Sequence, residues 1–60
     1  MKRFRLVFKD GKGHFQRVLF AHCIEEELQG IKESFALMIE QETGHPVFCE
    51  SISEQPEVDT

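Results

Sequence analysis

The stretch from Ile24 to Glu42 constrains the fold most strongly, because it has the pattern of a single amphipathic helix. Its apolar residues recur at spacings of three and four and therefore share one helical face. These residues are Ile24, Leu28, Ile31, Phe35, Met38 and Ile39. Gly44 can adopt the left-handed conformation that ends a helix, and Pro46 cannot continue one. We therefore expect one helix over about residues 24–42, with its apolar stripe packed against the rest of the chain.

The segment before the helix has the pattern of a β-hairpin. Over residues 2–9, apolar and polar side chains alternate, as in a strand with one buried face and one face in water. The apolar side chains of this strand are Phe4, Leu6 and Phe8. Asp10 and the glycines on either side of Lys12 predict a turn, so residues 14–21 form the returning strand.

The register of this hairpin stays open. A loop of four residues pairs Phe8 with Phe15, whereas a loop of three residues pairs Phe4 with Val18. Residues 18–20 are apolar on both faces of their strand, which is typical of a strand end that is covered on both sides or that lies at an interface.

A third strand over residues 47–53 follows the helix and completes the order β-β-α-β. This order predicts an α+β domain over residues 1–53, in which one three-stranded, mostly antiparallel sheet carries the helix on one face. We expect the third strand to pair with the first, which gives the sheet order 2-1-3 and leaves the other face of the sheet without a cover. Residues 54–60 are polar and acidic and are expected to form a disordered tail.

The charges divide the chain into a basic part, residues 1–20, and an acidic part, residues 21–60, although the net charge is −4. A nucleic acid would bind the basic β-hairpin. The candidate contacts there are Arg3, Arg5, Lys9, Lys12 and Arg17. A basic protein would bind the acidic helix, where the candidate contacts are Glu25, Glu26, Glu33 and Glu40. Charges of this kind also keep a protein soluble whether or not it has a partner. They therefore narrow the class of partner without identifying one.

Two cysteines and three histidines are the residues that bear most on catalysis and metal binding. Cys23 and Cys49 are expected to be reduced thiols, because the chain begins without the pattern of a signal peptide. His22 and Cys23 would lie at the start of the helix and His45 past its end, roughly 30 Å away at 1.5 Å per residue. His14, at the hairpin tip, can approach His45. We therefore expect no metal site, no cofactor and no catalytic residues.

Leu37 lies off the apolar stripe of the helix and has no role in a lone ββαβ unit. A core of this size rarely supplies more than about 3–5 kcal/mol of stability, and oligomerisation is a common remedy. Leu37 and the apolar residues 18–20 therefore predict a homodimer, with Leu37 as the candidate contact.

Four features of the chain also occur together in a known group of proteins. They are a basic-aromatic strand, an Asp-Gly hairpin, a helix start with the pattern Ala-x-x-x-Glu-Glu, and a return past glycine to a third strand. In this chain they are Phe4-x-Leu6-x-Phe8, Asp10-Gly11, Ala21 to Glu26, and Gly44 to Ile52. With them the chain resembles small ββαβ proteins of bacteriophages and prophages. Some proteins that look like this inhibit host defence, including certain anti-CRISPR proteins, so the resemblance implies a target in the host.

Together these patterns predict a small non-enzymatic protein of the cytoplasm that binds a host protein and has no membrane span. The first alternative is a nucleic-acid-binding module that uses the basic hairpin. The second alternative is a structural subunit that associates with itself.

Overall fold

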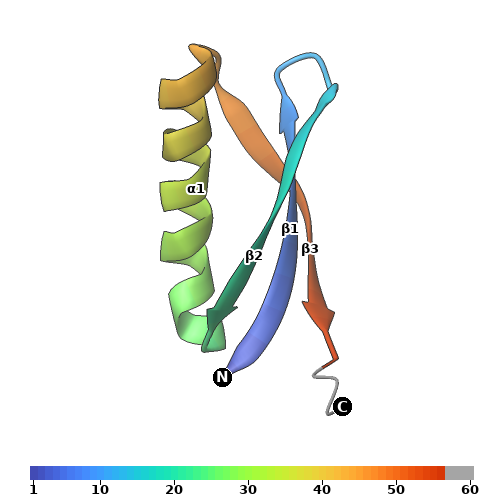
Figure 1. Cartoon of the computed structure of the whole chain (residues 1–60), viewed down its shortest axis with the longest axis vertical. Coiled ribbons are helices and arrows are strands. Elements are labelled where there is room, and N and C mark those ends of the chain that lie inside the picture. Colours follow the sequence, from blue (N-terminus) through green and yellow to red (C-terminus); the bar gives the residue numbers. More distant parts are fainter. Residues whose placement is uncertain (57–60) are drawn as a thin grey trace.

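The computed structural model describes residues 1–56, and its elements follow one another in the order β-β-α-β (Figure 1). They are β1 (Lys2–Asp10), β2 (Phe15–Cys23), a single 3-10 turn η1 (Glu25–Glu27), α1 (Leu28–Thr43) and β3 (Val47–Gln55). The strands form one sheet in the order β2-β1-β3, and β1 is antiparallel to both neighbours. The α+β architecture and the strand order expected from the sequence are therefore confirmed. Residues 57–60 of the expected tail lie outside the described residues.

The hairpin turn is held by the side chain of Asp10. Its Oδ1 accepts hydrogen bonds from the backbone N–H groups of Lys12 and His14, both at 2.9 Å. Gly13 has a φ of 82°, in the left-handed region that favours glycine. The turn chemistry expected from the sequence is therefore present, with the aspartate as its main acceptor.

The register of the hairpin differs from both alternatives that the sequence left open. Lys9 pairs with Phe15 at the end of the hairpin. The next pair along β1 joins Phe8 to Arg17, so Gln16 is left over as a β-bulge in β2. The extra residue shifts every later residue of β2 by one position relative to its partner in β1. The alternation of apolar and polar residues in the sequence does not reveal such a shift.

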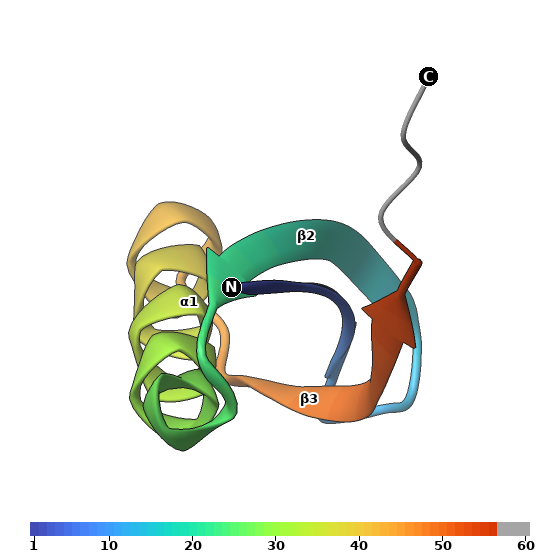
Figure 2. The same cartoon turned by 90° about the horizontal axis from the view of Figure 1, so that it is seen from below.

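β3 carries a second bulge, at Glu50. Val7 pairs with Ser51. The next residue along β1, Phe8, pairs with Cys49, so Glu50 has no partner of its own. Both neighbours of β1 are therefore irregular at the level of Phe8. Because a bulge increases the local twist, the two bulges account for part of the strong twist of the sheet in Figure 2.

The helix begins later than the sequence predicts. Ile24 is extended, with φ −82° and ψ 158°, and the three glutamates after it form η1. The α-helix itself runs from Leu28 to Thr43, and no side chain caps its start. Gly44 closes the helix with a φ of 79°, and its N–H donates to the carbonyl of Glu40 at 2.8 Å. The predicted end of the helix is therefore confirmed, while the predicted start is about one turn too early.

The core lies between α1 and the face of the sheet that carries the alternating apolar residues of β1. Its buried residues are Phe4, Leu6, Phe8, Ala21, Cys23 and Ile39. The helix packs against them with Leu28, Ile31, Phe35 and Ala36. Two residues of the expected stripe are exposed, since Ile24 is 47% and Met38 is 39% accessible to solvent. Ile24 precedes the helix, and Met38 lies at the edge of a stripe in which Ile39 is completely buried.

α1 covers one side of the sheet only (Figures 1 and 2). β3 runs away from α1 toward its C-terminal end, and Ile52 is 39% exposed although it pairs with the buried Leu6. β3 also continues to Gln55, so Glu54 and Gln55 belong to the sheet and not to the tail in which the sequence placed them.

Candidate functional site

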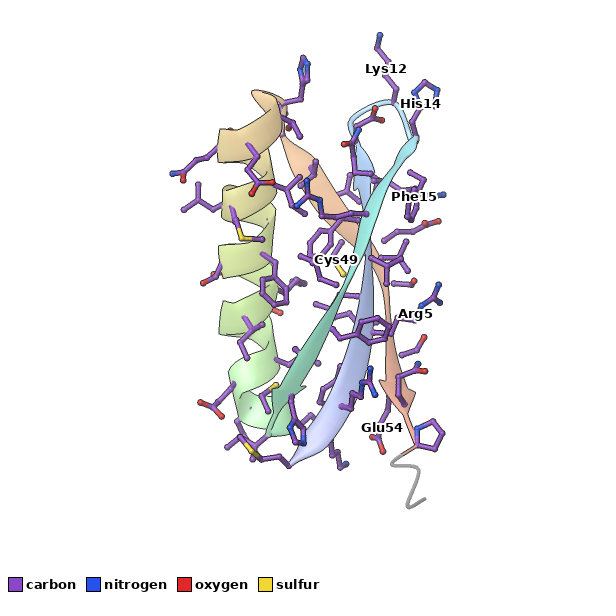
Figure 3. The ribbon with its side chains drawn as sticks, viewed as in Figure 1. Arg5, Lys12, His14, Phe15, Cys49 and Glu54 are labelled. Carbon is purple, nitrogen blue, oxygen red and sulfur yellow. The ribbon has the colours of Figure 1, made fainter. Side chains whose placement is uncertain are left out.

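The side of the sheet opposite α1, here called the open face, follows from the strand pairing. Because side chains alternate along a strand, the residues of β1 that lie between its buried residues point to this side. The open face consists of Arg3, Arg5, Val7 and Lys9 from β1, Phe15, Val18, Phe20 and His22 from β2, and Phe48, Ser51, Ser53 and Gln55 from β3. Figure 3 shows Arg5 and Phe15 on the side of the sheet away from α1, and Cys49 between the sheet and α1.

Three phenylalanines give the open face its apolar surface. The side chain of Phe15 is 61% exposed, and those of Phe20 and Phe48 are each 48% exposed. Between them lies the half-buried cross-strand pair of Val7 and Val18. Single exposed apolar residues are ordinary, but large ones gathered on one face indicate an interaction surface.

Two arginines of the central strand lie beside one of these rings. Arg5 pairs directly with Phe20 across the hairpin. The guanidinium carbon of Arg3 lies 4.8 Å from the centroid of the same ring, which is a cation–π contact. Phe20 is therefore the centre of a cluster in which cationic and aromatic groups are in contact.

Lys9 occupies the other end of the open face, in the row between Phe15 of β2 and Phe48 of β3. Its Nζ lies 2.9 Å from Oε1 of Glu50, the residue that forms the bulge in β3. This ion pair offsets one positive charge, so the two arginines supply the net positive charge of the open face.

Only some of the basic residues that were predicted to contact a nucleic acid share the open face. The members that share the open face are Arg3, Arg5 and Lys9. Arg17 points to the α1 side instead, where its Nη1 lies 2.9 Å from Oε2 of Glu42. The bulge at Gln16 causes this change, because without it Arg17 would share a face with Phe15. Lys12 lies at the hairpin tip, away from the middle of the sheet (Figure 3).

The acidic residues expected to contact a protein lie apart from the open face. Glu25 and Glu26 belong to η1, where the chain enters the helix, whereas Glu33 and Glu40 are exposed on α1. Leu37 is 55% exposed and, at 100° per residue, lies between those two glutamates on the outer side of the helix. Leu37 and the open face therefore occupy opposite sides of the molecule.

One hollow lies where the hairpin tip approaches the loop after α1. It is lined by Asp10, Gly11, Lys12, His14, His45 and Pro46, so the two histidines do approach the same place. Nδ1 of His14 lies 3.6 Å from Oδ2 of Asp10. The backbone N–H of His14 holds the pKa of Asp10 below its ordinary value of 3.8. Within residues 1–56, no group of three or more His, Cys, Asp or Glu side chains is arranged to hold a metal ion.

The two thiols lie at different levels of the sheet, both on the α1 side. Cys23 is buried and pairs with Lys2, whereas Cys49 pairs with Phe8. These levels are 8 − 2 = 6 residues apart along β1, about 20 Å at 3.3 Å per residue, which is too far for a disulfide bond. Burial raises the pKa of the Cys49 thiol and so disfavours the thiolate. His22 points to the open face, away from its neighbour Cys23.

Phe48 is a large apolar member of the open face that sequence reasoning missed. The signal was present, because Val47 and Cys49 alternate with it and both pack against the core. A strand with these two side chains inward must turn Phe48 outward.

The fold and the open face define a small two-layer α+β domain with one sheet face uncovered. Comparisons with protein-family models, with curated proteins and with solved structures find no match to this chain. No helix in the described part of the chain is long and apolar enough to cross a membrane.

Proposed function

We propose that this chain is a small non-enzymatic protein that docks on a host macromolecule through its open face. The proposal is supported mainly by the gathering of Phe15, Phe20 and Phe48 on the one side of the sheet that α1 leaves uncovered. Aromatic side chains bury a large area on binding, and arginine is enriched among the residues that dominate binding energy. Arg3 is already held against Phe20, which reduces the entropy that binding would cost.

The open face is a better candidate than the acidic helix that the sequence favoured. The outer side of α1 offers one large apolar side chain, Leu37, between the charged side chains of Glu33 and Glu40. A solvated helix face commonly has this composition. The resemblance to small phage proteins is in keeping with a docking role. Within this proposal the protein acts in the cytoplasm and inhibits a host-defence protein, as anti-CRISPR proteins do.

Site-specific photocrosslinking tests the choice of face. Benzoylphenylalanine is placed at Phe20 in one variant and at Leu37 in another, and each is irradiated in host-cell lysate with and without excess unmodified protein. We expect adducts between the Phe20 position and host molecules that the unmodified protein competes away, and no adducts between the Leu37 position and host molecules. Competed adducts with host molecules from the Leu37 position alone would assign the contact to the helix and contradict the proposal.

A further inference from the structure

The open face is positively charged although the chain as a whole is acidic. Its cations are Arg3, Arg5 and Lys9, and within residues 1–56 the carboxylate that accompanies them is that of Glu50. The acidic helix α1 lies on the other side of the sheet (Figure 2). An anionic partner is therefore attracted to the open face and repelled from the helix, so the charges alone would orient it.

A second copy of the chain fits this face less well. A two-fold dimer brings the same patch of both copies together, so the arginines of one copy would meet those of the other. Like charges that face one another across an interface cost several kcal/mol. Glu50 does not relieve this repulsion, because its carboxylate is already bound to Lys9 at 2.9 Å.

The rings of Phe15 and Phe20 on β2 are far enough apart to stack on two different planar groups, such as two bases. Phe15 pairs with Lys9 and Phe20 with Arg5, so the two rings are 9 − 5 = 4 residues apart along β1, about 13 Å at 3.3 Å per residue. Every nucleic-acid base has a π-face, so bases stack on such rings with little dependence on sequence. Guanidinium planes also stack on bases, and that of Arg3 lies against Phe20.

From this geometry we infer that the open face binds single-stranded nucleic acid. Bases stack on Phe20 and Phe15, while Arg3 and Arg5 contact the phosphates. A single strand fits better than a duplex, because the bases of a duplex are already stacked on one another and an exposed sheet face reaches only unstacked ones. This inference rests on the proposed function, since it names the partner of the same face.

Fluorescence anisotropy with labelled oligonucleotides of about 12 nucleotides tests the inference. Single-stranded DNA, single-stranded RNA and a duplex of the same sequence are compared at about 0.15 M salt. We expect a single strand to bind more tightly than the duplex. The logarithm of its affinity should fall with the logarithm of the salt concentration with a slope of about −1.4, since each of the two arginine contacts to phosphate contributes about −0.7. Phe20→Leu, which keeps the apolar bulk but removes the ring, should weaken binding by about 5- to 150-fold.

Two arginine variants form a matched control. Arg5→Gln and Arg17→Gln remove the same charge from opposite sides of the sheet. We expect Arg5→Gln to weaken the binding of the single strand and Arg17→Gln to leave it unchanged. Equal losses would overturn the inference, because a diffuse charge effect would then explain the binding. Failure of both single strands to bind at about 100 μM protein would overturn it as well.

An NMR titration of the unmodified protein separates the two proposals and does not depend on any variant folding. Shifts at the amides of Arg5, Val7 and Ser53 on adding the single strand would support both. If the single strand shifts amides around Leu37 instead, both proposals are wrong. If no oligonucleotide binds but the Phe20 position crosslinks to a protein, the open face remains the docking surface and only the nucleic-acid inference fails.

Discussion

The ring of Phe35 meets the ring of Phe8 edge to face, with centroids 6.5 Å apart and an interplanar angle of 77°. This contact joins the middle of α1 to the central strand, where Phe8 is completely buried. Edge-to-face pairs contribute about 0.5–1.5 kcal/mol beyond the area that they bury. The pair therefore helps to fix how the helix lies on the sheet, since Ile39 is the one buried residue of α1.

Phe35→Ala should remove much of the stability of the domain. Large-to-small aromatic changes in cores cost about 3–5 kcal/mol, and we expect the low end because Phe35 is only half-buried. That loss is comparable to the whole stability of a domain of this size. Circular dichroism during thermal unfolding should show a variant that is largely unfolded at 25 °C. Gln41→Ala at an exposed position of the same helix is the control and should change the unfolding free energy by less than about 0.5 kcal/mol.

Gly30→Ala should stabilise the protein. Gly30 lies inside α1, and a Cβ placed there meets no atom within 4 Å. Alanine is favoured over glycine in a helix by about 0.8–1.0 kcal/mol, so the midpoint of urea unfolding should rise. Gly44→Ala is the contrasting variant. It should lower the midpoint, since Gly44 has a φ of 79° that other residues adopt only at a cost.

Asp10 should make the stability depend on pH in the acid range. The backbone N–H groups of His14 and Lys12 stabilise the charged carboxylate, which lowers its pKa in the folded state below the ordinary 3.8. A group with a depressed folded pKa adds stability that is fully present above its unfolded pKa and is lost as the pH falls through its folded pKa. We therefore expect the melting temperature to fall as the pH is lowered from about 5 to about 2.

Two variants separate the charge of Asp10 from its role as an acceptor. Asp10→Asn keeps an Oδ1 that can accept both hydrogen bonds but does not titrate. It should show a shallower fall of melting temperature over that pH range than the unmodified protein. Asp10→Ala loses the acceptor and should melt lower at neutral pH. An unchanged pH dependence in Asp10→Asn would assign the acid sensitivity to other carboxylates.

Self-association remains a prediction, and its candidate contact is Leu37 on the outer side of α1. Leu37→Lys should lower both the dimer fraction at micromolar concentration and the melting temperature, measured by light scattering coupled to size exclusion and by thermal unfolding. Because Glu33 and Glu40 flank Leu37, two copies repel one another there, so the dimer should strengthen as salt screens these charges. A mass of one chain at every salt concentration would show that Leu37 is an ordinary exposed leucine.

The periodicity of the sequence was sufficient for the architecture. Alternation over Phe4, Leu6 and Phe8 identified the buried face of the central strand, and Gly44 marked the end of the helix. The start of the helix was harder, because no capping residue marks it and the three glutamates after Ile24 form a 3-10 turn. Local preference and tertiary packing compete at such an end, and the pattern of apolar residues does not decide between them.

The candidate site was harder to predict than the fold. Arg17 was grouped with the other basic residues of the hairpin by its charge, and one unpaired residue, Gln16, turns it to the side of the sheet opposite Phe15. A bulge depends on how the twist of the whole sheet is accommodated, so it leaves no clear pattern in a short strand. The Arg3–Phe20 contact was missed for the same reason, since it depends on a register that the sequence left open.

The two bulges also bear on how the protein avoids aggregation. A three-stranded sheet has two edges, β2 and β3, whose free N–H and C=O groups are templates for strands of other chains. Gln16 interrupts one edge and Glu50 the other, both opposite Phe8. An incoming straight strand can therefore match only part of either edge before the hydrogen-bond spacing changes. The irregularities that set the register of this sheet thus also limit its growth into fibrils.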